Sequence, residues 1–329
     1  MSIGEGHSMN IAIVGGTGFL GAAIARALVG QGANVVQIAR GQMTQTPVTG
    51  AKFVAAERTD STALAAIFAA HHIEAVIDVM TLTLASTKPL LEATARAGAR
   101  YVMISAVDVY ANYGGLARME KPAIISRPLR EDDPVRKALF PYRTLPTKPA
   151  GIDPEILENY DKVPIEAAAR ANPSLILRLP AIYGPGDRQG RFAWLSAALR
   201  AGGPINIDAR TADWAQSFVY IDDAAAAVAR ATLSGITGQT FNIATWRRRT
   251  MGEWAQHFAQ ITGSSAQVIP APADAKALLF ERAEMTDLAY PLVLDGGRFA
   301  RQFGAVEQVE EAAAIGAARA WDDKVAADA

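Results

Sequence analysis

The first residues of this chain whose types and spacing could do chemistry are three glycines near its beginning. Residues 15–21 read GGTGFLG, directly after the β-branched run of residues 11–14 and at the start of a helical pattern. Gly15 permits a tight turn, Gly18 lets a phosphate approach the backbone, and Gly21 allows the helix to pack closely on the strand. The helix N-terminus adds free N–H donors and a positive dipole end. The pattern predicts a dinucleotide site whose contacts are Gly15, Thr17, Gly18, Phe19 and Leu20.

The end of the second predicted strand indicates which dinucleotide would bind. An acidic residue there would accept a hydrogen bond from the ribose 2′-hydroxyl of NAD, but the position holds Ala39, and Arg40 follows. A guanidinium suits a 2′-phosphate, so we expect NADP, with NAD as the second choice. Arg40 could also be a solvated cation at a strand end. Asp60 could hold the adenine amino group, cap a helix that begins at Ser61, or do both.

The composition excludes several other classes of protein. Half of the 329 residues are hydrophobic, which rules out a small disulfide scaffold or a disordered chain. The net charge is −1, so we expect a small-molecule substrate, with no nucleic acid and no membrane as partner. Cysteine is absent and the four histidines lack metal-ligand spacing, so we expect no metal. No segment has the pattern of a leader or a membrane span, and we expect a cytoplasmic protein.

Short apolar runs alternate with helical patterns, which is typical of β-α-β units and a parallel sheet. The strands are expected over residues 11–14, 35–39, 53–55, 75–79, 101–105 and 174–179, and a further strand over 240–243 returns to the same sheet. The predicted fold class is α/β, a Rossmann doubly wound parallel sheet with a smaller C-terminal α+β substrate domain. We expect the nucleotide-binding domain to comprise residues 9–180 plus about 213–245, and the substrate domain residues 181–212 plus 246–329.

Seven of the 17 prolines lie between residues 109 and 156, where we expect no long regular element. A loop of this length is commonly a lid or a binding loop. The alternative is a disordered insert, although Phe140, Tyr142 and Ile152 give it apolar anchors.

Several further strings, together with the glycine turn, make the chain resemble the extended short-chain dehydrogenase/reductase family, in particular its NAD-dependent epimerase/dehydratase branch. They are residues 76–78 (VID), 105–110 (SAVDVY), 178–187 (RLPAIYGPGD), 217–224 (SFVYIDDA) and 241–244 (FNIA). The resemblance covers about residues 10–245. It implies a Rossmann domain for the nicotinamide cofactor and a C-terminal domain for the substrate, often a nucleotide sugar. It also implies an active site of Ser or Thr, Tyr and Lys, and a homodimer.

This sequence departs from the family pattern at the hydroxyl residue. The place four residues before the Tyr of the Val-Tyr pair holds Ala106. Its neighbour Ser105 would point to the opposite face of the strand, because side chains alternate along a strand.

The Tyr-x-x-x-Lys motif is altered too, because Pro164 stands where Lys is expected after Tyr160. One register keeps Tyr160 as acid and base. The other keeps Lys162 as the clamp on the cofactor ribose, with Glu166 one turn beyond and Glu158 at the Tyr position. We prefer the second register, with a helix that begins near Tyr160, since Pro is tolerated in a first helical turn. In the alternative, both side chains merely decorate the helix terminus.

Two further positions are candidates for proton transfer. Asp108 follows the strand of residues 101–105, and the family's sugar-nucleotide dehydratases have an acidic acid/base there; it could also be a turn-forming residue. Tyr142 could supply the missing phenol. The basic run of residues 247–249 is expected to be a solvated turn, with a diphosphate contact as the secondary hypothesis.

Together these features predict an NADP- or NAD-dependent oxidoreductase or epimerase acting on a hydroxyl or keto group of a small, sugar-like molecule. Lys162 would orient the cofactor ribose, Tyr160 or Asp108 would move the proton, and Pro180 would line the nicotinamide site. The alternative, which the altered motif favours, is a catalytically degenerate NADP-binding sensor or scaffold.

Overall fold

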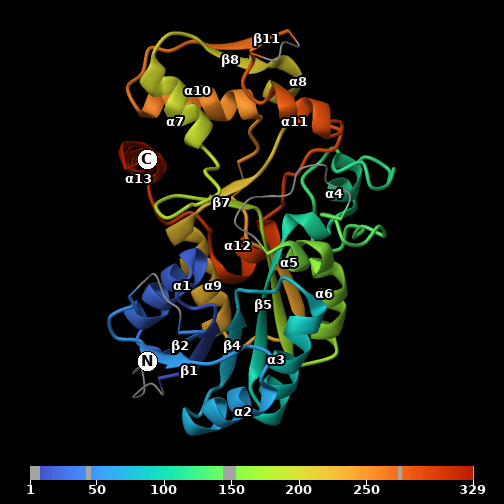
Figure 1. Cartoon of the computed structure of the whole chain (residues 1–329), viewed down its shortest axis with the longest axis vertical. Helices are drawn as coiled ribbons and strands as arrows, with labels where there is room; N and C mark the ends of the chain where they lie inside the picture. The colour runs from blue at the N-terminus through green and yellow to red at the C-terminus, as the bar shows by residue number, and fades with distance from the viewer. Residues whose placement is uncertain (1–7, 42–45, 144–152, 246, 273–275, 329) are drawn as a thin grey trace. The chain divides into compact units, whose positions relative to one another are not determined.

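The computed structural model describes residues 8–41, 46–143, 153–245, 247–272 and 276–328. The chain forms two compact units. The first consists of Met1–Ala106, Leu139–Arg178 and Ala225–Phe241, and the second of Val107–Ala138, Leu179–Ala224 and Asn242–Ala329. Figure 1 shows the course of the chain through both of them.

A seven-stranded sheet forms the centre of the first unit, in the order β10-β6-β5-β4-β1-β2-β3. Its strands are β1 (Asn10–Val14), β2 (Asn34–Ala39), β3 (Lys52–Ala55), β4 (Ala75–Asp78), β5 (Arg100–Ala106), β6 (Ser174–Leu179) and β10 (Gln239–Asn242). The pairs from β3 through β5 are parallel. The predicted doubly wound sheet is confirmed, and the predicted returning strand is β10, at the edge beside β6.

The helices of the first unit bury one apolar face against this sheet. They are α1 (Phe19–Gly30), α2 (Ser61–Ala70), α3 (Leu84–Arg96), α5 (Pro154–Asn159), α6 (Lys162–Arg170) and the larger part of α9 (Ile221–Leu233). Side chains of α2, α3 and α6, including Phe68, Leu90 and Ile165, form one core with β1, β2, β4, β5 and β6. The buried positions recur at helical spacing, which fixes α6 against the sheet (Figure 1).

The second unit contains two short parallel strand pairs, β7 (Ala181–Tyr183) with β9 (Phe218–Tyr220) and β8 (Ile205–Asp208) with β11 (Val268–Ala271). Its helices are α4 (Ala111–Leu116), α7 (Ala193–Ala201), α8 (Ala209–Ala212), α10 (Met251–Ile261), α11 (Phe280–Met285), α12 (Gly297–Phe303) and α13 (Glu311–Ala327). An aromatic cluster in which Phe192 contacts Tyr183, Phe218 and Trp254 lies in its core.

The proline-rich stretch has a short helix at each end, and its described residues contain no long regular element. The short helix α4 forms before the first of its prolines, and α5 begins with Pro154 at the first helical position. Proline is tolerated there because that N–H has no intrahelical partner, and Asp153 caps the helix by accepting from the Glu155 N–H at 2.9 Å. The predicted anchor Ile152 lies outside the described residues.

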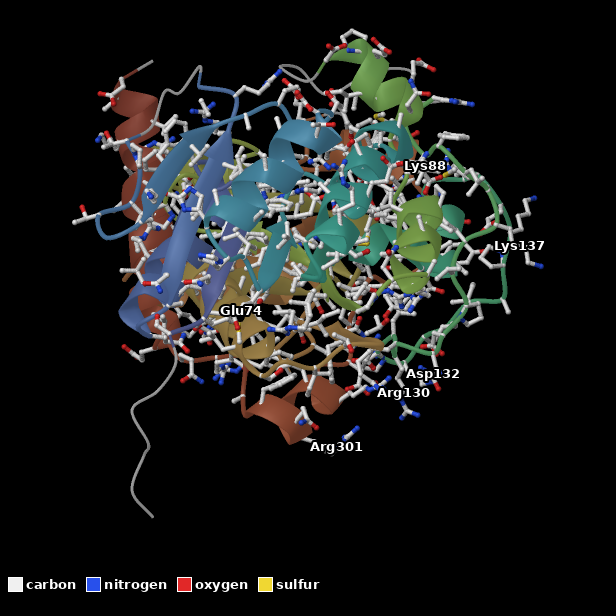
Figure 2. All side chains as sticks on the ribbon, turned by 90° about the horizontal axis from the view of Figure 1, so that it is seen from below. Glu74, Lys88, Arg130, Asp132, Lys137 and Arg301 are labelled. Carbon is white, nitrogen blue, oxygen red and sulfur yellow. The ribbon has the colours of Figure 1, made fainter. Side chains whose placement is uncertain are left out.

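Charged side chains divide into two kinds. Lys88, Asp132, Lys137 and Arg301 are exposed, and Figure 2 shows Asp132, Lys137 and Arg301 at the outer part of the view. Nine others among the described residues are buried in one unit or the other: Asp78, Asp108, Arg136, Asp161, Lys162, Glu166, Arg178, Asp208 and Asp223. An ionised group is costly to bury without partners, so we expect each buried charged side chain to have hydrogen-bond or ion-pair partners.

The glycine turn adopts the geometry expected from its sequence. Gly15 has φ of +81°, a left-handed conformation that favours glycine. A Cβ on Gly21 would lie 2.2 Å from the Gly15 carbonyl oxygen, whereas a Cβ on Gly30, in the same helix, would meet no atom within 4 Å. The close approach of α1 to β1 therefore depends on Gly21.

We expect Gly21→Ala to lower the free energy of unfolding by roughly 1–3 kcal/mol, because the added methyl overpacks the turn. The matched control Gly30→Ala should be neutral, or stabilising by up to about 1 kcal/mol through helix propensity. Urea unfolding followed by far-ultraviolet circular dichroism measures both. Equal stability of the two variants would contradict the assigned role of Gly21.

Candidate active site

The glycine turn presents an open helix N-terminus. Gly18 is the N-cap of α1 and no side chain caps the helix, so the first-turn N–H groups are not satisfied by a capping side chain. A Cβ on Gly18 would meet only the Gly15 carbonyl oxygen, at 3.4 Å, so space remains around this backbone. These are the features that an anionic phosphate requires.

A buried glutamine, which the sequence analysis missed, holds this turn in place. Gln37 in β2 is fully buried, and its Nε2 donates to the Gly16 carbonyl at 2.5 Å. Its Oε1 accepts from the Val48 N–H at 2.7 Å. The available signal was a polar residue in the middle of an apolar strand.

The two residues proposed for the nucleoside end lie after β2 and β3. Arg40 is exposed, and among the described residues it has no ion-pair partner. Asp60 caps α2, because its Oδ1 accepts from the N–H groups of Thr62 and Ala63 at 3.1 and 2.9 Å. The predicted capping role of Asp60 is therefore confirmed.

Lys162 is the first residue of α6 and is only 7% exposed. Its Nζ donates to the Thr81 Oγ1 at 2.6 Å, the Thr81 carbonyl at 2.9 Å and the Ile104 carbonyl at 3.2 Å. Thr81 follows β4 and Ile104 lies near the end of β5, so the ammonium sits at the carboxyl edge of the parallel sheet. This is the edge at which the glycine turn follows β1.

The start of α6 explains how the altered motif fits. The buried Asp161 caps the helix by accepting from the Val163 N–H at 2.9 Å, and its other oxygen accepts from the Phe140 N–H at 2.7 Å. Pro164 then falls in the first turn, as predicted. The helix start near Tyr160 is confirmed, and Asp161 also ties the proline-rich segment to α6.

Glu166, one turn beyond Lys162, is the centre of a buried network. Its carboxylate accepts from Arg178 Nε at 2.9 Å and Nη2 at 2.7 Å, from Ser105 Oγ at 2.6 Å and from Arg170 Nη2 at 2.8 Å. Burial alone would raise the pKa of Glu166, but the bonds and charges of Arg178, Ser105 and Arg170 outweigh it and lower that pKa. The Ser105 side chain therefore points toward α6.

Tyr160 and Tyr142 come together beside this helix. Their ring centroids are 4.9 Å apart, and the Tyr160 ring centroid is 5.7 Å from Lys162 Nζ. Tyr160 is buried, and Tyr142 comes from the proline-rich segment. Glu158, in contrast, belongs to α5 and its half-exposed carboxylate lies 4.0 Å from Arg143 Nε. The structure therefore places the Tyr160 ring near the ammonium and the Tyr142 ring against that of Tyr160.

A second buried carboxylate fixes the loop after β4, and the sequence analysis did not assign its partners. Asp78 accepts two bonds from Arg58, at 3.0 and 2.9 Å, and one from the Tyr101 hydroxyl at 2.7 Å. Burial and the adjacent Asp78 raise the pKa of Tyr101 well above its ordinary value. Arg58 also donates to the Met80 carbonyl at 2.7 Å. Arg58 therefore fixes the loop that carries Thr81 by binding both Asp78 and the Met80 carbonyl.

The geometry can now be compared with known proteins. Residues 11–134 match the model of the NAD dependent epimerase/dehydratase family. The predicted family resemblance is confirmed over these residues. The chain is also 27% identical over 237 residues to 2'-dehydrokanamycin reductase from Streptomyces kanamyceticus, a match that covers 68% of this chain and 58% of that relative's length.

Solved structures of low sequence identity share the fold. The enzyme WbmG from Bordetella bronchiseptica, in complex with NAD, has a TM-score of 0.68 at 20% identity and covers 98% of this chain and 96% of its own. A UDP-glucose 4-epimerase from Thermotoga maritima with UDP-glucose has a TM-score of 0.65 at 19% identity and covers 97% of this chain and 100% of its own.

In the second unit, three residues of the family strings have clear structural surroundings. Asp108 is buried in the single turn Val107–Val109, and its carbonyl accepts from Arg136 Nε at 2.7 Å. The hydroxyl of Tyr110, in the Val-Tyr pair, donates to Asn242 Oδ1 at 2.6 Å and is fully buried. Pro180 is buried between β6 and β7. Tyr110 therefore has a structural role.

The expectation of a solvated basic turn at residues 247–249 is wrong for two of its arginines. Arg247 and Arg249 both form ion pairs with Glu311, at the first position of α13, and His257 lies 2.8 Å from the same carboxylate. Burial alone would raise the pKa of Glu311, but its bonds to Arg249 and His257 lower it to about 2. Sequence spacing gave no sign of this distant partner.

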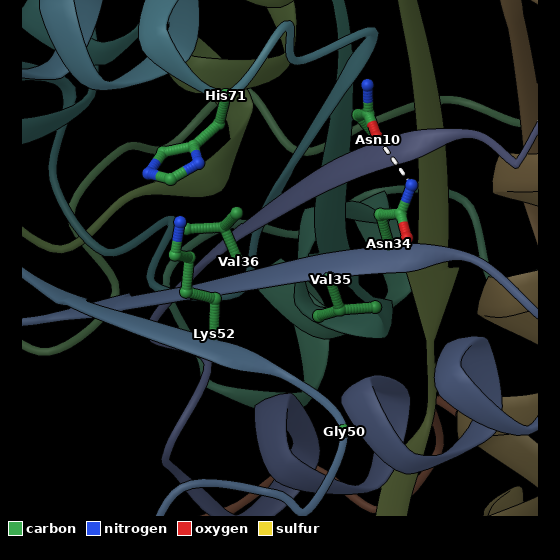
Figure 3. Close-up of a pocket in the computed structure, with 7 residues that line it drawn as sticks. All are labelled: Asn10, Asn34, Val35, Val36, Gly50, Lys52 and His71. Atoms are coloured by element: carbon green, nitrogen blue, oxygen red, sulfur yellow. Dashed lines mark hydrogen bonds between the residues drawn. The ribbon is translucent and has the colours of Figure 1, made fainter.

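A surface hollow of about 250 Å³ lies at the other edge of the sheet. Asn10, Asn34 and Lys52 begin β1, β2 and β3 there, beside His71 at the end of α2 (Figure 3). Because the strands are parallel, this hollow is at the opposite edge from the glycine turn. Within the described part of the chain, no group of three or more His, Asp or Glu could hold a metal ion, and no helix is long and apolar enough to cross a membrane.

We expect Arg178→Met to lower the free energy of unfolding by about 3–5 kcal/mol at neutral pH, because it leaves the Glu166 carboxylate buried without its main partner. The matched control Arg170→Met removes a half-exposed partner of the same carboxylate and should cost about 1 kcal/mol or less. Urea unfolding measures both.

The pH dependence provides a check. In the wild type the pKa of Glu166 is lowered on folding, so its contribution is present above the ordinary value of 4.5 and is lost as the pH falls below it. In Arg178→Met the pKa of Glu166 rises, so acid favours that variant relative to the wild type. The difference should shrink below pH 4.5, and a constant difference would contradict this account.

Proposed function

We propose that this chain is an NAD(P)-dependent oxidoreductase or epimerase that acts on a hydroxyl or keto group of a small, sugar-like molecule. One observation carries the proposal: the uncapped N-terminus of α1 and the buried ammonium of Lys162 lie at the same edge of one parallel sheet. Ligands of this fold bind at that edge. A relative named as a reductase and neighbours solved with NAD support the same reading.

The turn fits a dinucleotide because its helix end is open and Gly18 leaves space at the backbone. Gly15, Thr17, Gly18, Phe19 and Leu20 would hold the diphosphate. When bound, the nicotinamide would supply or accept hydride.

The remaining cofactor contacts follow the sequence. Arg40 would bind the 2′-phosphate, which makes NADP the first choice and NAD the second. Asp60 would face the adenine with the oxygen that does not cap α2. Lys162 would orient the ribose, and Pro180 would line the nicotinamide site.

Hydride transfer at a carbon requires a proton at its oxygen, and two groups are proposed to move it. Tyr160 is the first, because its ring centroid lies 5.7 Å from the Lys162 ammonium. Asp108 is the second, as a carboxylate two residues beyond the end of β5. Tyr142, in contact with Tyr160, is a third candidate and offers a second phenol.

A second candidate function is a dinucleotide-binding sensor or scaffold without turnover. Two observations favour it: the hydroxyl residue of the family is Ala106 here, and the ammonium of Lys162 already has three acceptors within the protein.

We further propose that the first unit binds the cofactor and the second the substrate, and that the chain is a homodimer.

Calorimetric titration with NADPH, NADP, NADH and NAD tests the cofactor site. We expect the phosphorylated forms to bind more tightly, and Arg40→Ala to weaken only these, by roughly 10–100-fold for a lost charge-assisted contact. Arg26→Ala, which removes an exposed charge from α1, is the matched control and should bind like the wild type. Binding of none of the four would overturn both candidate functions.

Turnover separates the two candidates. Oxidation of NADPH is measured with 2'-dehydrokanamycin and with 4-keto nucleotide sugars as probes. An enzyme should reduce one of them, and Lys162→Met should lower kcat at least about 100-fold, the lower range for loss of a group that supports proton transfer. The exposed control Lys88→Met should remain active. Tight cofactor binding with no turnover of any probe would favour the sensor.

A further inference from the structure

Thr81, in the loop after β4, contributes a side-chain hydroxyl that contacts the Lys162 ammonium. The Thr81 side chain is fully buried, so it is closed to a substrate. Its Oγ1 accepts from Lys162 Nζ at 2.6 Å and donates to the Ile104 carbonyl. The same carbonyl accepts from Lys162 at 3.2 Å, which closes a triangle of hydrogen bonds.

Together with the Thr81 carbonyl, the triangle places three acceptors around the ammonium. A lysine ammonium has three N–H donors, and Thr81 Oγ1, the Thr81 carbonyl and the Ile104 carbonyl provide three acceptors. A long side chain with several rotatable bonds is thereby ordered before any ligand arrives. Only Oγ1 among these acceptors can be removed by a side-chain substitution.

The loop that carries Thr81 also forms part of the glycine turn's surroundings. A Cβ on Gly15 would lie 2.5 Å from Met80 Cγ, so the residue before Thr81 covers that glycine. The Val79 N–H donates to the Val14 carbonyl at 3.1 Å. The loop therefore connects the proposed diphosphate site to the ammonium.

We propose that Thr81 is a positioning residue that fixes the Lys162 ammonium for the cofactor. The proposal rests on the proposed cofactor role of Lys162. Thr81 acts through Lys162 and touches neither the cofactor nor the substrate.

The test uses the full chain with isotope-labelled lysine side chains and nuclear magnetic resonance. A hydrogen-bonded, buried ammonium exchanges its protons slowly with water, and the Lys162 signal is identified by its absence in Lys162→Met. We expect Thr81→Val to speed this exchange at least tenfold and Thr81→Ser to restore slow exchange. The matched control is Thr94→Val, because the buried Thr94 hydroxyl donates to Leu90 within α3 at 2.7 Å, and it should leave the exchange unchanged.

NADPH affinity is measured on the same proteins. It should fall roughly tenfold in Thr81→Val, the order expected when a lysine side chain must be ordered on binding, and should be unchanged in Thr81→Ser and Thr94→Val. Unchanged or tighter NADPH binding in Thr81→Val overturns the proposal, as does fast exchange in the wild type. An equal loss in Thr94→Val shows a merely structural role and also overturns it.

Two safeguards keep the outcomes distinct. If Thr81→Val does not fold, Thr81→Cys replaces it, since a thiol is a weak acceptor of similar size. If the wild type binds none of the four dinucleotides, the proposed function fails and the positioning role for the cofactor fails with it. Slow exchange that depends on Thr81 then remains as a structural property. Binding by the wild type with no loss in Thr81→Val overturns the positioning role alone.

Discussion

The buried carboxylate of Glu166 is the interaction on which the arrangement of the first unit depends. It joins α6 to β5 through Ser105 and to β6 through Arg178, so one ionised group fixes a helix against two strands. Such a group is tolerated in the interior only because its oxygens are well provided with donors, including a bidentate guanidinium. Lys162 lies one turn before Glu166, and its position at the sheet edge follows from where Glu166 holds the helix.

A parallel constraint acts on the other side of the ammonium. Asp78, at the end of β4, binds Arg58 and Tyr101, and Arg58 extends to the loop after β4. The loop that offers two acceptors to Lys162 is thus fixed by a second buried carboxylate. Two separate ion-pair networks, one around Glu166 and one around Asp78, therefore fix the elements whose groups form the three hydrogen bonds of the Lys162 ammonium. Neither network contains a group that the family resemblance would assign to catalysis.

The parts of the site that could be predicted from the sequence are the local ones. The glycine turn was predictable because its three glycines act over seven residues, and the side of β5 on which Ser105 lies follows from strand alternation. The α6 start followed from the tolerance for Pro164 in a first turn. Each of these depends on neighbours within one element.

The other contacts join residues that are far apart in the sequence. Lys162 and Thr81 are 81 positions apart, and Arg249 and Glu311 are 62 apart, so no spacing rule relates them. The α+β character predicted for residues 246–329 came without bounds for individual elements, and the structure places α10 to α13 there, with Glu311 beginning the last of them. The buried Gln37 gave a signal as a polar residue in an apolar strand, but only the fold shows that it holds the glycine turn.

The chemistry of the ammonium's acceptors determines what the altered motif retains of the family pattern. Thr81 Oγ1 and the two carbonyls are neutral, so they order the Lys162 ammonium without cancelling its charge, as a carboxylate at the same distance would. The field of that charge extends to the Tyr160 ring, 5.7 Å away in a buried environment where screening by water is weak. The altered Tyr-x-x-x-Lys spacing therefore still leaves a buried cation beside a tyrosine ring, which is the pair that the proposed proton transfer uses.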